Sequence, residues 1–211
     1  YAYSRQAVDK AGVRLVRGRP GLVHPLPDGG IAFVSTRAKR FVLCNVTPVA
    51  TLHRMERDSS GIRMLSANYV NDFTPAVMPD GRILYTRWEY VDRPAVPIQS
   101  LWTIQPDGTN LRVFYGNRTL DPATFIEGRP IPGSTRVLCT LAPHNYGIEG
   151  AIGIVDNGQA FDGEAGLANV EGLLRIFTQV GVLYVPDPDQ GHVEGAGNGR
   201  GRQCEHVDVL L

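Results

Sequence analysis

Asp-Gly turns that recur at regular distances constrain the fold of this chain more than any other feature. Segment 26–37, LPDGGIAFVSTR, aligns with segment 78–89, MPDGRILYTRWE, at an offset of 52 residues. Segment 131–142, IPGSTRVLCTLA, aligns with the latter through Arg136 and Arg82, at an offset of 54 residues. Asp-Gly permits the positive φ of a tight hairpin turn, and a preceding Pro pre-sets that turn. The pattern therefore predicts a recurring β-hairpin.

A second hairpin recurs between these copies. Segment 52–68, LHRMERDSSGIRMLSAN, matches segment 101–117, LWTIQPDGTNLRVFYGN, and a weaker third copy starts at Ile152. The turn at 60–61 meets the turn at 107–108 to within one or two residues. Each unit thus holds four short strands in about 50 residues, which is typical of a β-propeller blade.

We therefore expect an all-β fold of the β-propeller type, with four-stranded blades in a partial or small ring. Residues 1–156 would form about three blades plus a partial strand, in which residues 1–5 loosely match Leu84–Arg87. Residues 157–211 read as an atypical C-terminal extension that covers the open edge or is partly disordered. Within it, the apolar spacing over 166–185 predicts one short helix near the C-terminus, followed by a strand.

Bulk composition excludes several classes of protein. Lys plus Arg and Asp plus Glu both number 21, which argues against a nucleic-acid-binding or basic membrane surface. No apolar run approaches the roughly 20 residues of a membrane span. The first residue is Tyr1, and no signal-peptide pattern follows, so we expect a processed or truncated piece.

The three cysteines, Cys44, Cys139 and Cys204, are far apart and form no Cys-x-x-Cys pair. This spacing excludes a disulfide framework, a zinc ribbon and a c-type haem attachment site. One disulfide is compatible with three cysteines, and at least one thiol is then left over. Buried or free cysteines are favoured over a functional thiol.

Several stretches resemble TolB-like, WD40-like (PD40-type) propeller repeats of large multidomain bacterial proteins. They are PDGxIxFxSTR, FTPxVxPDGRILYTRWEYVDR, LWTxxPDGT, YGN and RPIPGSTRVLCTLAPHNYG. Over residues 20 to 156 the chain most resembles the propeller-type middle domain of the hydrazine synthase alpha subunit family. That resemblance implies a binding or assembly scaffold in a periplasmic or other extracytoplasmic location. The family's haems are attached through Cys-x-x-Cys-His motifs, which are absent here, so no haem is expected.

The stretch after one predicted strand gathers aromatic and charged residues. Arg87, Trp88, Glu89, Tyr90 and Asp92 follow one another closely, and alternation along a strand puts different chemistry on opposite faces. They are candidate ligand-binding residues, with aromatic platforms beside charges. The alternative, which we favour, is a structural contact between blades held by an Arg–Glu or Arg–Asp pair.

A loop after another predicted strand, LAPHNYG at 141–147, is a second candidate. Its His144 is a candidate catalytic base or metal ligand, and Asn145 and Tyr146 are candidate ligand-binding residues. No nucleophile elbow of the G-x-S-x-G type lies near it. A loop histidine that only makes hydrogen bonds is the more common case.

The C-terminal region offers a third candidate. Asp187 and Asp189 lie before Gly191 and Glu194 follows it, a spacing that resembles the oxygen ligands of Ca²⁺ around a tight turn. The stretch lacks the full EF-hand spacing, and a solvated Gly-rich tail is favoured over a metal site. A zinc set is the other alternative, drawn from His192, Glu194, Cys204 and His206.

Two functions remain open. The first is a propeller module that binds a protein or a small molecule, or that self-associates through open blade edges. The second is a small Ca²⁺-dependent propeller hydrolase of esters or lactones, which would draw on His144, Glu89, Asp92 or Asp72. Whether the chain is an enzyme at all stays open at this point.

Overall fold

The computed structural model describes residues 23–44, 46–91, 98–120, 122–144 and 150–167 of the 211. Within these ranges the protein is all-β, as the turn pattern predicted. A short 3-10 helix, η1 (Glu164–Gly166), follows the last strand. The strands are β1 (Val23–Pro25), β2 (Ile31–Ser35), β3 (Thr51–Met55), β4 (Arg63–Met64), β5 (Asp72–Val77), β6 (Ile83–Trp88), β7 (Gln99–Ile104), β8 (Arg112–Tyr115), β9 (Thr124–Pro130), β10 (Arg136–Ala142) and β11 (Ala151–Asp156).

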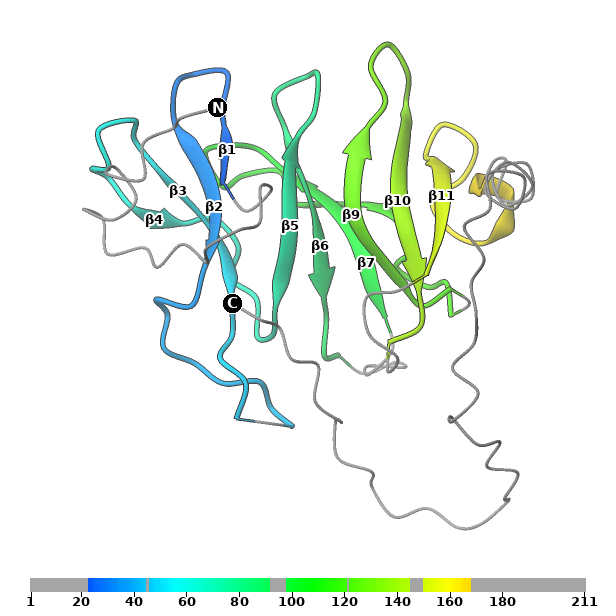
Figure 1. Cartoon of the computed structure of the whole chain (residues 1–211), viewed down its shortest axis with the longest axis horizontal. Helices are drawn as coiled ribbons and strands as arrows, with labels where there is room; N and C mark the ends of the chain where they lie inside the picture. Colours follow the sequence, from blue (N-terminus) through cyan, green and yellow to red (C-terminus); the bar gives the residue numbers. More distant parts are fainter. Residues whose placement is uncertain (1–22, 45, 92–97, 121, 145–149, 168–211) are drawn as a thin grey trace, which may run out of the picture.

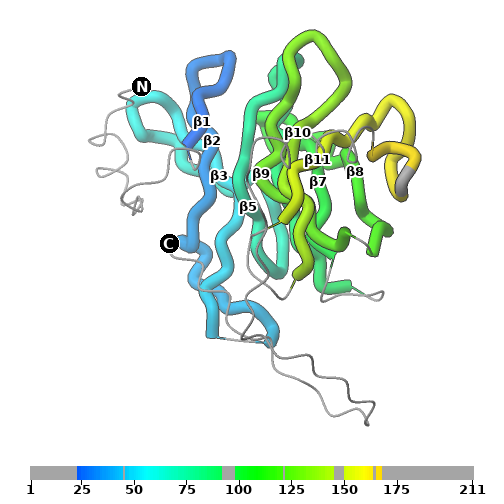
Figure 2. The backbone as a smooth tube through the Cα atoms, turned by 45° about the vertical axis from the view of Figure 1, so that its right-hand side comes forward, coloured from blue at the N-terminus to red at the C-terminus, as the bar shows by residue number. Residues whose placement is uncertain are grey.

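The strands form three antiparallel blades that stand side by side in chain order (Figure 1). Blade 1 comprises β1 to β4 and blade 2 comprises β5 to β8, which confirms the predicted four-stranded units. Blade 3 comprises β9 to β11 in the described part of the chain. A parallel pairing of Gln99 with Thr124 joins β7 to β9, so blades 2 and 3 share one sheet. Figure 2 shows β5 between blade 1 and β9.

The hairpin turns of blades 1 and 2 share one hydrogen-bond pattern. In the first turn, the N–H of Leu26 donates to the carbonyl of Gly30, four residues later. The carbonyl of Leu26 accepts from the N–H of Gly29, three residues later. The same two bonds start from Glu56, Met78 and Gln105. An aspartate two residues into each turn accepts a hydrogen bond from a backbone N–H, which fixes the turn. These aspartates are Asp28, Asp58, Asp80 and Asp107.

The turn between β3 and β4 refines the alignment of the second hairpin. Asp58 and Ser59 are the equivalents of residues 107–108, two positions before the pair at 60–61 that the sequence comparison chose. The second hairpins of blades 1 and 2 therefore repeat at a uniform offset of 49 residues. Ser59 has a φ of 71° where Gly108 has 92°, so the turn keeps its left-handed residue even without glycine.

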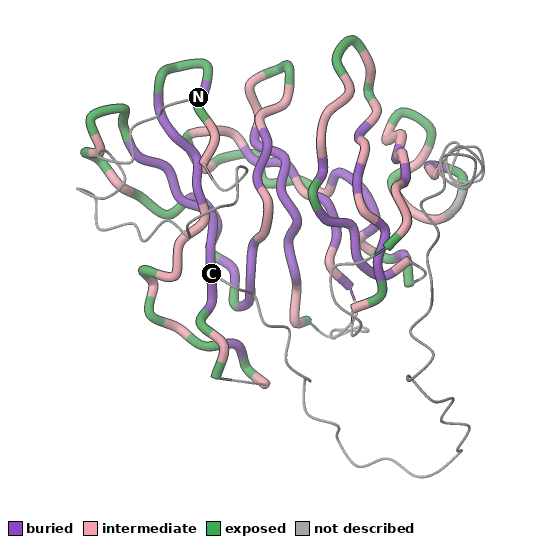
Figure 3. The backbone as a smooth tube through the Cα atoms, viewed as in Figure 1, coloured by how far each residue is buried: buried purple, intermediate pink, exposed green. Residues whose placement is uncertain are grey.

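The apolar core lies between the blades. Figure 3 shows that buried residues run along the strands. Because side chains alternate along a strand, each blade has one face toward the preceding blade and one toward the following blade. We call these its receiving face and its leading face. On the leading face of blade 1, Ala32, Leu52 and Leu65 pack against Ile83, Tyr85 and Ile104 of blade 2. On the leading face of blade 2, Leu84, Leu101 and Phe114 pack against Val137, Cys139 and Val155 of blade 3.

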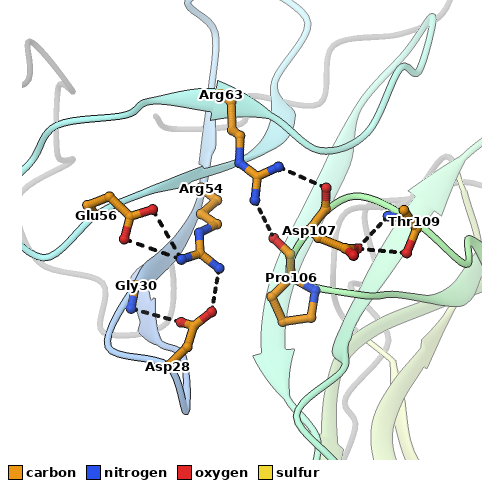
Figure 4. A network of polar contacts seen from close by, with 8 residues as sticks. All are labelled: Asp28, Gly30, Arg54, Glu56, Arg63, Pro106, Asp107 and Thr109. Atoms are coloured by element: carbon orange, nitrogen blue, oxygen red, sulfur yellow. Dashed lines mark hydrogen bonds and ion pairs between the residues drawn. The ribbon is translucent and has the colours of Figure 1, made fainter.

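Polar contacts near the hairpin turns also join blades 1 and 2 (Figure 4). Arg63 of β4 donates to the backbone carbonyls of Asp107 and Pro106 in the β7–β8 turn, at 2.8 and 3.2 Å. Within blade 1, Arg54 donates at 2.6 Å to Asp28 of the first turn. That hydrogen bond holds the pKa of Asp28 below its usual range, so the pair stays charged at neutral pH.

Residues 157–167 contact the end of blade 2. The N–H of Gly116 donates to the carbonyl of Phe161 at 2.9 Å, and the N–H of Arg118 donates to the Asp162 carboxylate at 2.7 Å. The domain boundary at residue 156 stays a prediction. The helix expected over 166–185 falls almost wholly outside the described residues. In the part that is described, no helix is long and apolar enough to cross a membrane.

Candidate functional site

The two sequence candidates in the described region lie at one end of the blades. The Asp turns occupy the upper edge in Figure 1, where odd-numbered strands pass into even-numbered ones. At the lower edge, which we call the loop end, β6 and β10 finish and β7 begins. In the described part of the chain, residues 36–44, 46–50, 89–91 and 143–144 adjoin the strand ends there. Loops at one end of a rigid β scaffold are a common place for binding residues.

Trp88 at the end of β6 is a core residue of the loop end. Its side chain is only 6% exposed, and it packs in a cluster with Val42, Val49 and Val70. These three residues precede β5 in the chain, so Trp88 joins blade 2 to the segments that leave blade 1. The geometry favours the structural interpretation of Trp88, because a ring buried to this extent offers little surface to a ligand.

Tyr90 and His144 flank the buried Trp88 ring. The Tyr90 ring meets it edge-on with centroids 6.0 Å apart, and the His144 ring lies tilted at 5.2 Å. Both flanking side chains are partly exposed. The structure thus brings together the two stretches that the sequence analysis singled out separately, one after β6 and the other after β10.

Gln99 at the start of β7 forms a hydrogen bond with His144. The Gln99 side-chain amide nitrogen lies 2.7 Å from His144 Nδ1. An amide NH₂ only donates, so Nδ1 accepts and the ring hydrogen sits on Nε2. Burial lowers the pKa of His144, which keeps the imidazole neutral at pH 7. With Nδ1 occupied, Nε2–H is the group that His144 can offer as a donor.

Arg87 serves as a connector between blades. Its Nε lies 3.1 Å from the Glu89 carboxylate, and its Nη1 donates to the Ser66 hydroxyl at 3.0 Å. Its guanidinium also lies 5.4 Å from the centre of the Trp102 ring, within the range of a cation–π contact. Ser66 follows blade 1, so the Arg87–Ser66 bond joins the two blades, whereas the Arg87–Glu89 pair lies within blade 2 and does not itself cross between blades.

Asp72 lies fully buried at the start of β5. Its carboxylate accepts from the backbone N–H of Leu52 at 2.9 Å and from the Asn68 amide at 3.0 Å. The same Asn68 amide donates to the carbonyl of Trp88 at 2.8 Å. Burial raises the pKa of Asp72 to about 6, against the lowering effect of these hydrogen bonds. Asp72 is therefore tied into the scaffold rather than turned toward the loop-end surface.

The segment 36–50 between β2 and β3 forms a small hairpin at the loop end. Backbone bonds join Val42 to Thr47 at 3.0 Å and Val49 to Arg40 at 2.8 Å. Val42 and Val49 point inward onto Trp88, as the cluster above describes. The two neighbours of Val42 are large, apolar and exposed, Phe41 at 62% and Leu43 at 67%.

Cys139 is a free cysteine of the described region. It lies in β10 on the receiving face of blade 3 and is a free, buried thiol. Burial raises its pKa to about 12, so it stays protonated at neutral pH and is a poor nucleophile. A buried cysteine was the interpretation favoured from the sequence.

The remaining predicted residues lie outside the described part of the chain. They are Asp92, Asn145 and Tyr146 of the ligand-binding set, Asp187, Asp189 and Glu194 of the calcium set, and His192, Cys204 and His206 of the zinc set. Among the described residues, no three His, Cys, Asp or Glu side chains gather in a way that could hold a metal ion. The described hydrolase candidates Glu89, Asp72 and His144 are engaged by other side chains.

Two parts of the loop end were missed in the sequence. Gln99 looked like an ordinary strand residue, and no local pattern links it to a histidine 45 positions later. The alternation of Phe41, Val42 and Leu43 does carry a signal, because period-two patterns put one set of side chains outward. All three residues are apolar, however, so the sequence alone does not show which side chains point outward.

Comparisons with known proteins give matches among solved structures. A hydrazine synthase structure from Kuenenia stuttgartiensis covers 63% of this chain with a TM-score of 0.52 and 15% identity. A putative TolB from Agrobacterium tumefaciens covers 67% with a TM-score of 0.45 and 16% identity. TolB from Acinetobacter baumannii covers 68% with a TM-score of 0.44 and 12% identity. No family model matches the chain, and no curated protein does.

The match to hydrazine synthase supports the propeller-type fold that the repeats predicted, and the resemblance stated from the sequence is confirmed at the level of fold. At 15% identity the similarity extends to the fold alone. This chain spans 20% of the hydrazine synthase chain and 48% and 31% of the two TolB chains.

Proposed function

We propose that this chain is a propeller-type binding or assembly module that takes a protein partner at its loop end. The observation that carries the proposal is the hairpin of segment 36–50. Its inward residues Val42 and Val49 are anchored on Trp88, and this anchoring turns Phe41 and Leu43 toward solvent. Large apolar side chains that are held outward by a packed base are typical of protein interfaces.

The surroundings of the hairpin suit an interface. Tyr90 and His144 are partly exposed beside the same Trp88 ring, and aromatic residues are enriched where proteins bind each other. The Nε2–H of His144 adds one hydrogen-bond donor of fixed position. Arg87 and Asp72 hold the blades beneath, so the surface rests on a rigid base rather than on a free loop.

A photo-crosslinking experiment tests this proposal. Benzoylphenylalanine is placed at Phe41 in the full chain and, as a matched control, at Leu120, which is 56% exposed outside the hairpin. The purified protein and an extract of its source cells are irradiated. We expect a discrete crosslinked product from position 41, either a dimer or a heterologous adduct, that position 120 does not give.

The Leu43→Ser variant then tests specificity, because it removes an apolar contact beside the crosslinker without touching Val42 or Val49. Loss of the product in this variant supports a defined interface. Equal products from positions 41 and 120, or a product that is indifferent to Leu43→Ser, would overturn the proposal.

Other parts of the sequence-based hypothesis stay predictions. Self-association through blade edges and an extracytoplasmic location rest on the repeats and on the resemblance. A Ca²⁺-dependent hydrolase gains no supporting observation from the described residues. Native mass spectrometry of the purified chain would report oligomeric state and bound metal together.

A further inference from the structure

The receiving face of blade 1 is buried, although its described apolar cluster draws on blade 1 alone. Ile31, Phe33 and Met55 on this face are 2%, 1% and 0% exposed. The apolar side chains described in contact with them, Val23 and Ile62, belong to the same blade. One face of a sheet does not bury itself, so another segment must cover it.

The equivalent face of blade 2 identifies what kind of segment this is. By the repeat offsets, Ile83, Tyr85 and Ile104 are the equivalents, in that order, of the three buried residues of blade 1. In blade 2 these residues receive Leu52 and Leu65 from the outer strands of the preceding blade. Blade 1 therefore carries a face built to receive the outer strands of a blade that precedes it.

The sequence before β1 carries the pattern of such an outer hairpin. Segment 3–16, YSRQAVDKAGVRLV, aligns without a gap with segment 52–65, LHRMERDSSGIRML. The offset is 49 residues, the same as between the second hairpins of blades 1 and 2. This register replaces the loose match of residues 1–5 to Leu84–Arg87, because it extends over a whole hairpin. The residues identical in the two segments are Arg5, Asp9, Gly12 and Arg14.

We propose that residues 3–16 are the outer hairpin of a preceding blade and cover the receiving face of blade 1. Val16 takes the position of Leu65, which is buried against blade 2. Leu15 takes the position of Met64, which is 46% exposed. Val16 thus faces blade 1, while Leu15 faces away from it.

The proposal also assigns a partner to Arg14. Arg14 takes the position of Arg63, which donates to two backbone carbonyls of the next blade's outer turn. Shifted by 49 residues, those carbonyls belong to Arg57 and Asp58 in the β3–β4 turn. The polar contact of Figure 4 would then recur at the boundary before blade 1, whereas at the boundary after blade 2 the equivalent Arg112 bonds to Asn110 within its own blade.

Methionine oxidation of the full chain tests the covering hairpin. Met55 on the covered face is 0% exposed, whereas Met64 is exposed and serves as an internal reference. Hydrogen peroxide oxidises accessible methionines, and peptide mass spectrometry follows each residue. In Val16→Asp we expect Met55 to oxidise roughly tenfold faster relative to Met64, because a buried carboxylate displaces the hairpin. In the matched control Leu15→Asp, Met55 should stay protected.

Further variants distinguish the hairpin of residues 3–16 from a different cover over the same face. Val16→Ala, a milder change, should give a smaller increase in Met55 oxidation if Val16→Asp fails to fold. Protection of Met55 that persists in both Val16 variants, or equal loss in Val16→Asp and Leu15→Asp, would overturn the proposal. So would faster oxidation of wild-type Met55 on dilution, which would mean that a second copy covers the face. Loss of protection on deletion of 168–211 alone would assign the cover to that segment instead.

Discussion

The Asp72 carboxylate accepts a hydrogen bond of 2.9 Å from the backbone N–H of Leu52, so the first strand of blade 2 is fastened to the third strand of blade 1. Burial raises the pKa of this carboxyl from 3.8 to about 6. The folded state therefore binds a proton more tightly than the unfolded state does. This contribution to stability is complete below pH ~4 and is lost as the pH rises through ~6, by roughly 3 kcal/mol.

Comparison of the wild type with Asp72→Asn isolates that contribution. Burial lowers the pKa values of His53 and His144, which adds stability as the pH rises in an overlapping window. These histidines are present in both proteins, so their effect cancels in the difference. Urea unfolding at pH 4 and pH 7 measures the free energy of unfolding of each protein. Between these pH values the wild type should lose more of it than Asp72→Asn does, by the contribution of the Asp72 carboxyl. Parallel pH profiles for the two proteins would contradict the assignment.

Trp88→Ala should destabilise the protein by about 3–5 kcal/mol, because it empties the space between blade 2 and the segments around Val42 and Val49. Urea unfolding followed by circular dichroism measures the effect. Tyr69→Ala is the control, since Tyr69 is 68% exposed, and it should change the free energy of unfolding by less than about 0.5 kcal/mol. If Trp88→Ala were as mild as the control, Trp88 would belong to a recognition surface after all.

Ser59→Gly should stabilise the protein by about 0.5 kcal/mol. Ser59 has a φ of 71°, a left-handed conformation that costs a non-glycine residue about 1–2 kcal/mol. Glycine removes that cost. It also increases the conformational entropy of the unfolded chain, which offsets part of the stabilisation. The converse change, Gly81→Ala at a φ of 86°, should cost about 1–2 kcal/mol. Thermal unfolding of both variants checks the pair, and shifts of equal sign would count against this account.

Arg63→Ala should lower the free energy of unfolding by about 0.5–1.5 kcal/mol, through loss of the hydrogen bonds to the carbonyls of Pro106 and Asp107. Arg63→Lys should recover only part of this, because an ammonium lacks the two-pronged geometry. The matched control is Arg112→Ala, which removes the equivalent arginine of blade 2, bonded to Asn110 within its own blade. Unfolding in urea should rank Arg63→Ala as the more harmful change.

The hairpin turns were predictable because their determinants are local. A left-handed residue and an aspartate that accepts a backbone N–H lie within five consecutive positions, and Asp28, Asp80 and Asp107 show this directly in the sequence. Ser59 shows the limit of such reasoning. It occupies the position that glycine holds in the other turns. The sequence alignment therefore placed this turn two residues too far along the chain.

The loop end was only partly predictable, because its contacts join distant parts of the chain. Trp88 and His144 were each singled out from neighbouring residues, but nothing local indicates that their rings meet. From the sequence, Asp72 was named only as a carboxylate that a hydrolase would draw on. Its burial follows from a backbone donor, Leu52, which the chain brings into place only when blades 1 and 2 pack together.

The position of the apolar clusters between blades, and not inside them, has a consequence for how the chain folds. A lone blade would have nothing to bury its faces against, so the smallest unit able to nucleate is a pair of neighbours, held together by residues such as Leu52 and Ile83. From that pair, structure would spread along the chain one blade at a time. Blade 2 packs against both of its described neighbours, so its opening would disrupt both of these interfaces.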